Sequence, residues 1–502
     1  MSSRIVDAPE SVHGGLVVLD GIGLGVEDVV RLADGAARPV PGTDAMRRAE
    51  ESWNAARQIA ATGRVYGRST GVGANRNEDV PTEAAAGHGL RLLRSHAGAI
   101  GAELPARQVR AMLAVRANQL LAAGAGLRPS VITALCAALE TGAYPVVNEF
   151  GSVGTGDIAP LAQLGLALAG EHPWRGAGAP EVQPLDNNDA LALISSNALT
   201  LGQAALALHE LQGLIGATQV VAALSLLAVD GSHEAYAAPV HAARPHRGSV
   251  EVARRMRELI GAADRPTPPL GRIQDPYGFR CLPQIHGPAH DAADALEQVL
   301  AVEINAAAEN PLISVEDLAA YHHGGFYQAQ LALALDHFRL AVTQVARLST
   351  SRLSTLNEPA YTRLRPFLAD HEPASSGVMI LEYSAGAALG DLRAFSAPAS
   401  LGHAVLSRGV EEQASFASLA ARQTLRACAA YRLVVGCELV AAVRALRQRD
   451  LKPDPDLPVG RALALAEAAL DEDPADRPLT DDVTAAAALL DRFTDIWRGS
   501  TS

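Results

Sequence analysis

The sequence predicts a mainly α-helical protein, with a smaller N-terminal domain and a central bundle of long helices. Apolar residues make up 48% of the 502 residues but aromatic residues only 4%, so the core consists mainly of Ala, Leu and Val. Ala and Leu are strong helix formers, and Val is the only abundant β-branched apolar residue. A helical spacing of apolar residues from about Glu83 and a long C-terminal stretch without proline support the same class.

The first half of the chain changes character near residue 70. Before it, Gly and short Val/Leu runs such as GGLVVLDG are typical of small strands and turns. Residues 106–124 then predict a helix that ends before the Gly-Leu-Arg-Pro at 126–129. Residues 171–189 are rich in Gly, Pro and Asn and predict a surface loop, and residues 190–229 predict an apolar helix.

The second half contains the longest predicted helices. From Leu331 the apolar positions follow spacings of 4, 3, 4 and 3, which predicts a seam that faces a helix bundle. These positions are Leu331, Leu335, Phe338, Val342 and Val345.

Two further helices complete the second half. Residues 411–449 contain no proline and predict one long helix. Thr480 is predicted to cap the last helix, with Asp481 and Asp482 against its dipole. We predict an N-terminal domain over residues 1–215 and the bundle with C-terminal helices over 216–502. Because helices of this length need partners along their whole length, other subunits are expected to complete the bundle.

Charge and composition exclude several classes of function. The formal net charge of −13 argues against a nucleic-acid partner, because phosphate binding needs a basic face. The N-terminus MSSRIVDAPESVHGG has no apolar signal core, and we see no run of about 18 apolar residues, so we expect a cytoplasmic protein without a membrane partner. The four cysteines have no CxxC spacing, which predicts no metal site.

Five short segments concentrate polar groups that a helical core does not require. They are VYGRSTGVG with Tyr66, RSHAGAIG with His96, GSVGTGDIAPLAQ from Gly151, QDPYGFRCLPQIHG with Arg280, and VEEQASF with Glu411 at the start of the long helix. Tyr66 is a candidate acid or base if its pKa is lowered, and Arg280 suggests a carboxylate clamp. A packed tyrosine, a lone helical histidine and a dipole-complementing glutamate are the ordinary alternatives, so no segment is specific alone.

Taken in order, the segments resemble the histidine and phenylalanine ammonia-lyase family. The order is Tyr-Gly-x-x-Thr-Gly-x-Gly, Ser-His-Ala, Gly-Ser-Val-Gly with Gly-Asp-Ile-Ala-Pro-Leu-Ala, Gln-Asp-Pro-Tyr-x-x-Arg-Cys-x-Pro-Gln-x-His-Gly, and Glu-Ile-Asn with Glu-Asn-Pro-Leu. The resemblance covers about Leu19 to Leu446. It implies an ammonia-lyase-like (fumarase/aspartase-like) helical architecture and a homotetramer whose pockets combine segments of several subunits.

In that family an Ala-Ser-Gly triplet cyclises with loss of two waters and gives a methylidene-imidazolone electrophile (MIO), so that no metal or nucleotide cofactor is expected. The resemblance implies a carbon–nitrogen lyase that acts on an amino-acid-like substrate. It assigns Tyr66 as the catalytic base, Tyr277 as the second catalytic tyrosine and Arg280 as the carboxylate anchor. Gln274 and Phe326 match other substrate-binding positions.

Three further positions match residues of the histidine-specific branch. They are His96 and Met379, as substrate-binding residues, and Glu411, as a catalytic residue. A glutamate beside an imidazole can accept a ring N–H. On these markers alone the resemblance implies histidine as the substrate.

Several departures from the family surround one site. The segment GSVGTGD is one residue shorter than the family's Gly-Ser-Val-Gly-Ala-Ser-Gly-Asp, so either Gly154, Thr155 and Gly156 serve as the triplet or the triplet is broken. A dehydrated Thr155 would carry an extra methyl group on its β-carbon. Ser195 replaces an asparagine that helps hold the prosthetic group. The other replacements are Gly325 and Gly409 for asparagines, Val410 for glutamine and Gln413 for histidine.

Three hypotheses remain open from the sequence. The first is an MIO-type ammonia-lyase or aminomutase for a histidine-like or aromatic amino acid, with an MIO-like group formed around Thr155. The second is a family member without the prosthetic group that catalyses another reaction on an amino-acid-like substrate in the same pocket. The third is a non-catalytic binding homologue, against which the retained Tyr66 and Arg280 count.

Overall fold

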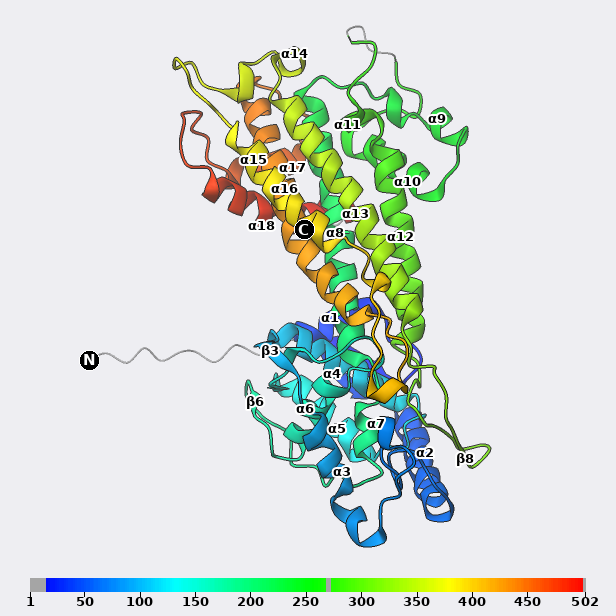
Figure 1. Ribbon diagram of the computed structural model, residues 1–502. Helices are drawn as coiled ribbons and strands as arrows, with labels where there is room; N and C mark the ends of the chain where they lie inside the picture. Colours follow the sequence, from blue (N-terminus) through cyan, green and yellow to red (C-terminus); the bar gives the residue numbers. More distant parts are fainter. Residues whose placement is uncertain (1–14, 268–271, 500–502) are drawn as a thin grey trace, which may run out of the picture. The chain divides into compact units, whose positions relative to one another are not determined.

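A computed structural model describes residues 15–267 and 272–499, which form two compact units. Within the described residues, the first unit comprises residues 15–206, Val299–Ala332 and Ser400–Leu419, and the second comprises residues 207–267, 272–298, Leu333–Ala399 and 420–499. Most of the chain is helical in both units, which confirms the predicted class (Figure 1). The first unit includes two segments that the predicted division at residue 215 assigns to the other domain.

The first unit begins with a small parallel sheet. Strand β1 (Gly15–Leu19) pairs with β2 (Ala37–Pro41), in a register that places Gly15 opposite Ala37, and helix α1 (Val26–Ala33) connects them. Helix α2 (Thr43–Thr62) follows. The prediction of only strands and turns before residue 70 is therefore wrong. The buried face of α2 consists of alanines and one serine, so its apolar period is weak in the sequence.

The rest of the first unit packs short helices around a buried central helix. This helix is α4 (Ala106–Leu121), in which every residue from Val109 to Leu121 is buried, and it contacts α1 and α5. The other helices are α3 (Thr82–His96), α5 (Pro129–Thr141), α6 (Ile158–Leu168) and α7 (Ala190–Ile194). Three two-stranded antiparallel sheets accompany them: β3 (Ile100–Glu103) with β5 (Asn148–Phe150), β4 (Tyr144–Pro145) with β6 (Trp174–Arg175), and β7 (Leu312–Ser314) with β8 (Ala319–Tyr321).

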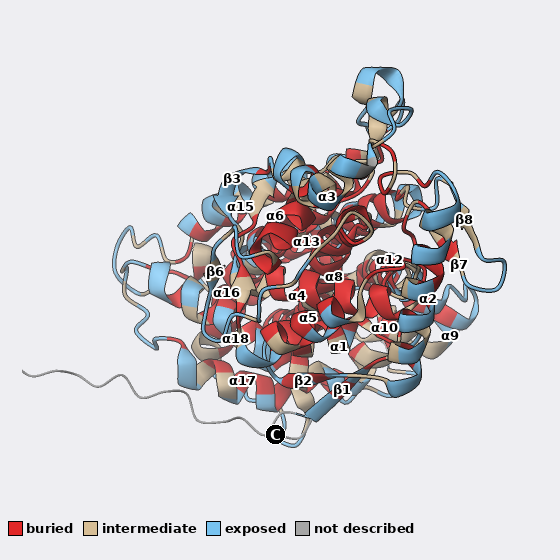
Figure 2. Ribbon diagram, turned by 90° about the horizontal axis from the view of Figure 1, so that it is seen from below, coloured by how far each residue is buried: buried red, intermediate tan, exposed pale blue. Residues whose placement is uncertain are grey.

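The second unit contains the predicted bundle of long helices. Its helices are α8 (Ala198–Ala228), α9 (Ala238–Ala242), α10 (Arg247–Ile260), α11 (Tyr277–Arg280), α12 (Leu282–Glu303), α13 (Ala329–Leu356), α14 (Pro359–Thr362), α15 (Ile380–Phe395), α16 (Ala417–Gln448), α17 (Pro458–Ala469) and α18 (Thr480–Arg498), of which α8, α12, α13 and α16 extend beyond it. Side-chain hydrogen bonds join α8 to α16, and the buried residues concentrate along α8 and α13 (Figure 2). The predicted seam on α13 is confirmed, because its five residues are fully buried.

Three predicted helix limits are wrong. The helix predicted over residues 190–229 is interrupted at 195–197, where Ser196 accepts the N–H of Asp157 through its carbonyl. The helix predicted from residue 411 begins only at Ala417. Thr480 is the first residue of α18 rather than its cap, and its side chain makes no capping hydrogen bond.

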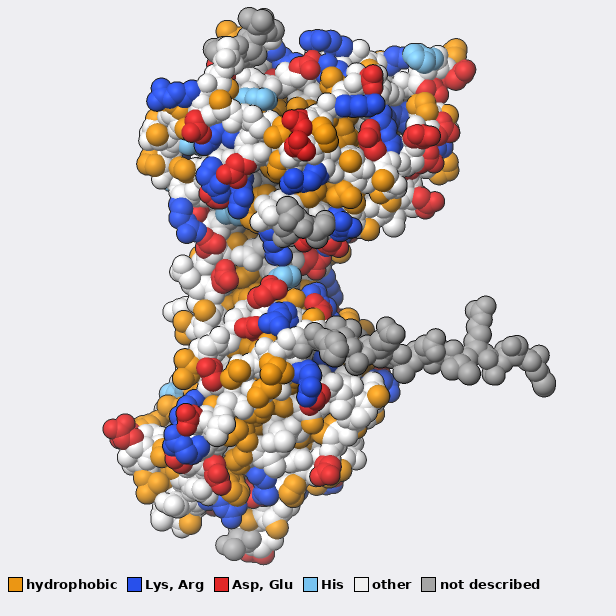
Figure 3. Space-filling model, turned by 180° about the vertical axis from the view of Figure 1, so that it is seen from behind, with side chains coloured by type: hydrophobic (Ala, Val, Ile, Leu, Met, Phe, Trp, Pro, Cys, Tyr) orange, Lys and Arg blue, Asp and Glu red, His pale blue; other side chains and the backbone are white. Residues whose placement is uncertain are grey.

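One long apolar stretch and the charged surface bear on the membrane and charge predictions. Residues Ala190–Ala228 are long and apolar enough to cross a membrane, with a mean hydropathy of 1.7 in their most apolar 18-residue window, so the prediction of no such run is wrong. However, 89% of the most apolar window is buried inside the protein, as expected of a core helix. On the face in Figure 3, Lys and Arg side chains lie interspersed with Asp and Glu in both units.

Candidate active site

A cavity of about 680 Å³ opens within the first unit, and it has the size of a small-molecule site. Its walls come from the loop after α2, the segment that leads into α6, the end of α7, the region between α12 and α13, and the stretch before α16. Six residues predicted for the site line it: Tyr66, Thr155, Gly156, Ser195, Phe326 and Glu411.

The loop after α2 holds the phenol of Tyr66 in this cavity. The backbone N–H of Gly73 donates a hydrogen bond of 2.8 Å to the phenol oxygen. Gly67, next to the tyrosine, has φ +70°, and a β-carbon there would lie 2.1 Å from a methyl group of Leu191. Only glycine therefore fits the turn that presents Tyr66.

The surroundings of Tyr66 make its phenolate a strong base. Burial is the largest effect and raises the pKa of Tyr66 above its usual value of 10. The N–H of Gly73 opposes this rise, the carboxylate of Glu411 adds to it, and the charge of Arg76 opposes it. The pKa of Tyr66 is thus raised, whereas its predicted role as an acid or base was tied to a lowered pKa. The ring of His322 meets the Tyr66 ring edge-to-face, with the centroids 6.3 Å apart.

The backbone that leads into α6 is clamped by the segment before α16. Three successive carbonyl groups, at residues 152–154, each accept one hydrogen bond from residues 415–418. The donors are, in order, the hydroxyl of Ser418 over 2.9 Å, the N–H of Phe416 over 2.9 Å and the hydroxyl of Ser415 over 2.8 Å. The shape of this backbone therefore depends on residues more than 250 positions away in the chain.

Within this clamped segment, Ser152 bridges the two glycines. Its hydroxyl accepts the N–H of Gly154 and donates to the carbonyl of Gly156, both over 3.2 Å. The side chain of Thr155 lies between them, partly exposed in the cavity, and its hydroxyl has no hydrogen-bond partner among the described residues. A free hydroxyl is thus presented where the family forms its electrophile.

Asp157 holds the same segment against α8. Its fully buried carboxylate accepts hydrogen bonds from the N–H and the hydroxyl of Thr200, both over 2.8 Å. Burial raises the pKa of Asp157, and the hydrogen bonds of Thr200 and Ser152 oppose the rise. This carboxyl faces α8 and does not line the cavity, so its role is structural.

These residues do not fit the MIO group of the resembled family. Ring closure would consume the carbonyl oxygen of Gly154, which is the acceptor of the buried Ser415 hydroxyl. A β-carbon on Gly154, as in the family's alanine, would lie 2.2 Å from the Ser415 oxygen. Thr155 carries a methyl group where the family needs an unsubstituted methylene. The hydroxyl of Ser195, in place of the family's asparagine, already accepts the N–H of Asn310 over 3.0 Å.

Phe326 and Glu411 reach the cavity from two other segments. The side-chain amide of Asn197 donates to the carbonyl of Phe326 over 2.8 Å and so fixes the backbone of that aromatic residue. Glu411 does not start a helix, as the sequence predicted, but forms an antiparallel bridge with Leu406. Phe416, with φ +53°, separates this bridge from α16.

Gly154 and five other predicted residues do not line the cavity. His96 lies at the end of α3, where a ring nitrogen contacts the Leu92 carbonyl over 2.9 Å. Gln274, Tyr277, Arg280 and Met379 belong to the second unit.

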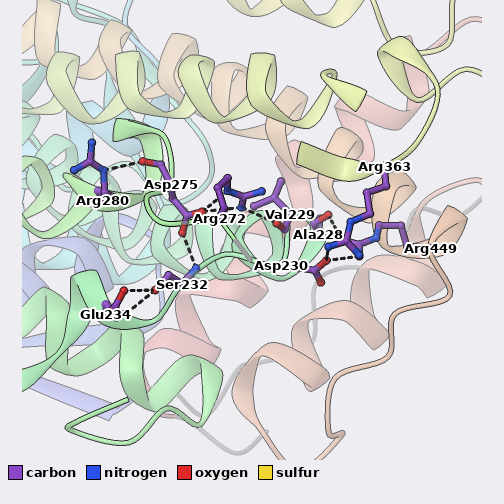
Figure 4. Close-up of polar contacts among 10 residues, drawn as sticks. All are labelled: Ala228, Val229, Asp230, Ser232, Glu234, Arg272, Asp275, Arg280, Arg363 and Arg449. Atoms are coloured by element: carbon purple, nitrogen blue, oxygen red, sulfur yellow. Dashed lines mark hydrogen bonds and ion pairs between the residues drawn. The ribbon is translucent and has the colours of Figure 1, made fainter. Parts of the chain in front are cut away.

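Figure 4 shows that Arg280 donates through Nε to the carbonyl of Asp275 over 2.7 Å, while Asp275 binds Arg272 and the N–H of Ser232. The guanidinium of Arg280 also lies 4.8 Å from the ring centre of Tyr277, which is 68% exposed. Its two terminal nitrogens have no hydrogen bond within the described residues.

Several polar residues of the cavity were not predicted from the sequence. They include Arg64, Arg76 and Asn77, which extend the Tyr66 loop, and His322 and Tyr327, which precede and follow Phe326. The proximity of both groups to predicted residues was the signal that could have found them. Among the described residues, no group of three or more His, Cys, Asp or Glu could hold a metal ion.

Comparisons with known proteins give consistent results. A family model described as aromatic amino acid lyase matches residues 24–471. Histidine ammonia-lyase of Geobacillus kaustophilus is 36% identical over 455 residues, which cover 86% of this chain and 89% of that protein. The ergothioneine-degrading enzyme ergothionase from Treponema denticola, solved with desmethyl-ergothioneine sulfonic acid, has a TM-score of 0.88 at 25% identity and covers 96% and 99% of the two chains. Tyrosine aminomutase from Streptomyces globisporus has a TM-score of 0.89 at 25% identity, over 96% and 98%.

Proposed function

The chain belongs to the aromatic amino acid lyase family and is a carbon–nitrogen lyase, and we propose that it eliminates the amine of a histidine-like or aromatic α-amino acid with Tyr66 as the base. The observation that carries the proposal is the position of the Tyr66 phenol oxygen. It lies in the cavity, accepts a hydrogen bond from Gly73 and has the carboxylate of Glu411 nearby. A phenolate there can take a proton from the β-carbon of a bound substrate while the α-carbon releases its amine.

Glu411 is assigned as the residue that binds the ring of the substrate. A carboxylate accepts the N–H of an imidazole, and Glu411 has no cation paired with it among the described residues. Histidine is the named substrate of the Geobacillus relative, and the ergothionase relative is named for ergothioneine. The name of the Geobacillus relative favours a histidine-like ring over a plain phenyl ring for this chain.

The carboxylate anchor and the assembly are proposed from the resemblance. Arg280 is the proposed anchor, since its terminal nitrogens are free for a bidentate carboxylate contact. We propose a homotetramer in which several subunits contribute to each pocket. A monomeric mass in solution would count against it.

We propose that the segment with Thr155 stays open rather than forming an MIO-like group. The clamp on the Gly154 carbonyl and the hydrogen-bonded Ser195 support the open form. In the open form, the pocket catalyses the reaction without the prosthetic group. A purely binding role is less well supported, because the chain keeps Tyr66 in the cavity and Arg280 with free terminal nitrogens.

Intact mass and turnover test these proposals together. The purified chain is weighed, then incubated with histidine, tyrosine, phenylalanine and ergothioneine while the near-ultraviolet absorbance of the unsaturated acids is followed. Formation of an unsaturated acid by a chain of unmodified mass is the expected result. A mass lower by two waters would overturn the open form, and saturable binding without turnover of any substrate would favour the binding homologue.

A further inference from the structure

A second cavity, of about 350 Å³, lies within the second unit and has the size of a site for a small ligand. Its walls are the C-terminal ends of α8 and α16 and the residues that follow each helix, as far as His233 and Pro453. Most of the lining is apolar and consists of Leu226, Leu227, Leu446, Leu451 and Pro453. Such a wall suits the hydrocarbon part of a ligand.

Each of the two helices is followed by an aspartate with a left-handed backbone. Asp230 has φ +48° and Asp450 has φ +47°, at helix ends where glycine is the usual residue. This conformation costs about 1–3 kcal/mol for a residue with a side chain. Both carboxylates face cations: Asp230 lies 2.6 Å from Arg449 and 3.4 Å from Arg363, and Asp450 lies 3.6 Å from Lys452.

The hydrogen-bond acceptors at the end of α8 are engaged. Figure 4 shows the carboxylate of Asp230 against the guanidinium groups of Arg363 and Arg449. The carbonyl of Ala228 accepts a hydrogen bond from Arg449 over 2.8 Å, and that of Val229 accepts one from Arg272 over 2.9 Å. Because these acceptors already bind arginines, the cavity is poorly suited to a cationic ligand.

Two hydrogen-bond donors of the lining are free. Lys452 is the only lysine in the sequence, its side chain is 77% exposed, and 3.6 Å to Asp450 is too long for a good hydrogen bond. The half-buried ring of His233 forms no hydrogen bond with any residue that the structure describes. Even a neutral imidazole carries one N–H donor. An ammonium and an imidazole beside an apolar wall complement a carboxylate that is joined to an apolar body.

We infer that this cavity binds an apolar monocarboxylic acid, with its carboxylate at Lys452 and His233 and its hydrocarbon body against the leucines. The inference goes beyond the proposed function and does not depend on it. The wall of the cavity also supports the proposed carboxylate anchor. Ser232, which lies next to His233, donates its N–H to the carboxylate of Asp275, and the carbonyl of Asp275 accepts Nε of Arg280 (Figure 4).

The single lysine allows binding to be measured at this cavity alone. Reductive methylation of the full-length protein with carbon-13 formaldehyde converts Lys452 to its dimethyl form, which keeps the positive charge. The NMR spectrum then contains one lysine signal beside that of the α-amine. This signal is followed while the protein is titrated with trans-cinnamate, cinnamyl alcohol or cinnamylamine, which share one hydrocarbon body and differ in charge.

We expect trans-cinnamate to shift the Lys452 signal in a saturable way. Its Kd should lie about 5- to 10-fold below that of cinnamyl alcohol, as one or two partly exposed charge contacts would give. Cinnamylamine should bind more weakly than either, because its ammonium would lie beside Lys452.

Variants that keep Lys452 test the two parts of the site. Leu227→Phe places a larger side chain in the cavity and is expected to abolish the shift with both the acid and the alcohol. Leu433→Phe, at a 45% exposed leucine of α16 outside the cavity, is the matched control and should leave both affinities unchanged. His233→Leu removes one donor and should weaken binding of trans-cinnamate about 3-fold without weakening that of the alcohol. Thermal unfolding checks the fold of each variant.

Three results would overturn the inference. The first is the absence of a saturable shift of the Lys452 signal with trans-cinnamate. The second is binding of cinnamylamine that equals or exceeds that of trans-cinnamate, which would exclude the carboxylate as the recognised group. The third is a shift that Leu227→Phe leaves unchanged, which would place the bound acid outside the cavity. None of these measurements uses turnover, so failure of the proposed elimination would leave this site standing, and loss of this site would leave the elimination standing.

Discussion

The hydroxyl of Ser415 donates a hydrogen bond of 2.8 Å to the carbonyl oxygen of Gly154 and leaves no room for a side chain on that glycine. A β-carbon at Gly154 would also lie 2.9 Å from the backbone nitrogens of Phe416 and Ala417. Because backbone cannot move aside as a flexible side chain can, the short segment and the residues before α16 fit each other only with glycine at this position.

Gly154→Ala is therefore expected to destabilise the protein by about 3 kcal/mol, from overpacking together with a β-carbon at φ +87°. The midpoint of chemical unfolding measures the change. Gly98→Ala is the matched control, since a β-carbon there meets nothing within 4 Å. Equal stability of the two variants would show that Ser415, Phe416 and Ala417 leave room for a β-carbon at Gly154.

Tyr66→Phe removes the proposed base and keeps the ring. We expect kcat to fall about 100- to 10,000-fold, the usual contribution of a general base. Tyr144→Phe, at a tyrosine outside the cavity, is expected to be neutral. Since the active form is the phenolate and the pKa lies above 10, log kcat/KM of the wild type should rise with pH up to at least 10. A flat profile between pH 7 and 10 would contradict this role.

Two charges in the cavity act on Tyr66 in opposite directions. The carboxylate of Glu411 raises the pKa of Tyr66, so Glu411→Gln should move the rising limb of the pH profile to lower pH. The guanidinium of Arg76 lowers that pKa, so Arg76→Gln should move the limb to higher pH. The position of the limb is read independently of the maximal rate. Shifts of both variants in the same direction would refute the assignment.

Much of the cavity could be predicted because its residues lie in recognisable segments. Tyr66 is surrounded by glycines, Thr155 stands in a short Gly-rich segment, and Phe326 and Glu411 occupy positions that the family resemblance identifies. Arg76 and His322 stand in no recognisable motif, and only their proximity to Tyr66 and Phe326 in the sequence could have pointed to them. They enter the cavity only because the folded loop and the region after β8 place them there.

The wrong helix limits have a common physical cause. The sequence from residue 411 is compatible with a helix, but Phe416 and Ser415 form hydrogen bonds with residues 153 and 154 instead. At residues 195–197 the carbonyl of Ser196 is likewise taken by the distant Asp157. Long-range hydrogen bonds override local propensity at both places, and neither is visible in a local window.

Arg352 and Glu438 form a fully buried ion pair inside the second unit and lead to the last prediction. Nε and one terminal nitrogen of Arg352 lie 2.6 and 2.8 Å from the two carboxylate oxygens, and both side chains are 0% exposed. Glu438 also accepts the hydroxyls of Ser225 and Ser349. The carboxylate thus holds α8, α13 and α16 together.

Glu438→Ala would leave the Arg352 charge buried without a partner, and we expect a loss of about 3–5 kcal/mol in unfolding free energy. The double variant Arg352→Met with Glu438→Leu removes both charges and should recover most of that loss. The test compares the unfolding midpoints of the wild type, Glu438→Ala and the double variant, followed by circular dichroism. If the double variant were no more stable than Glu438→Ala, the loss would come from the serine hydrogen bonds and the cavity rather than from the unpaired guanidinium.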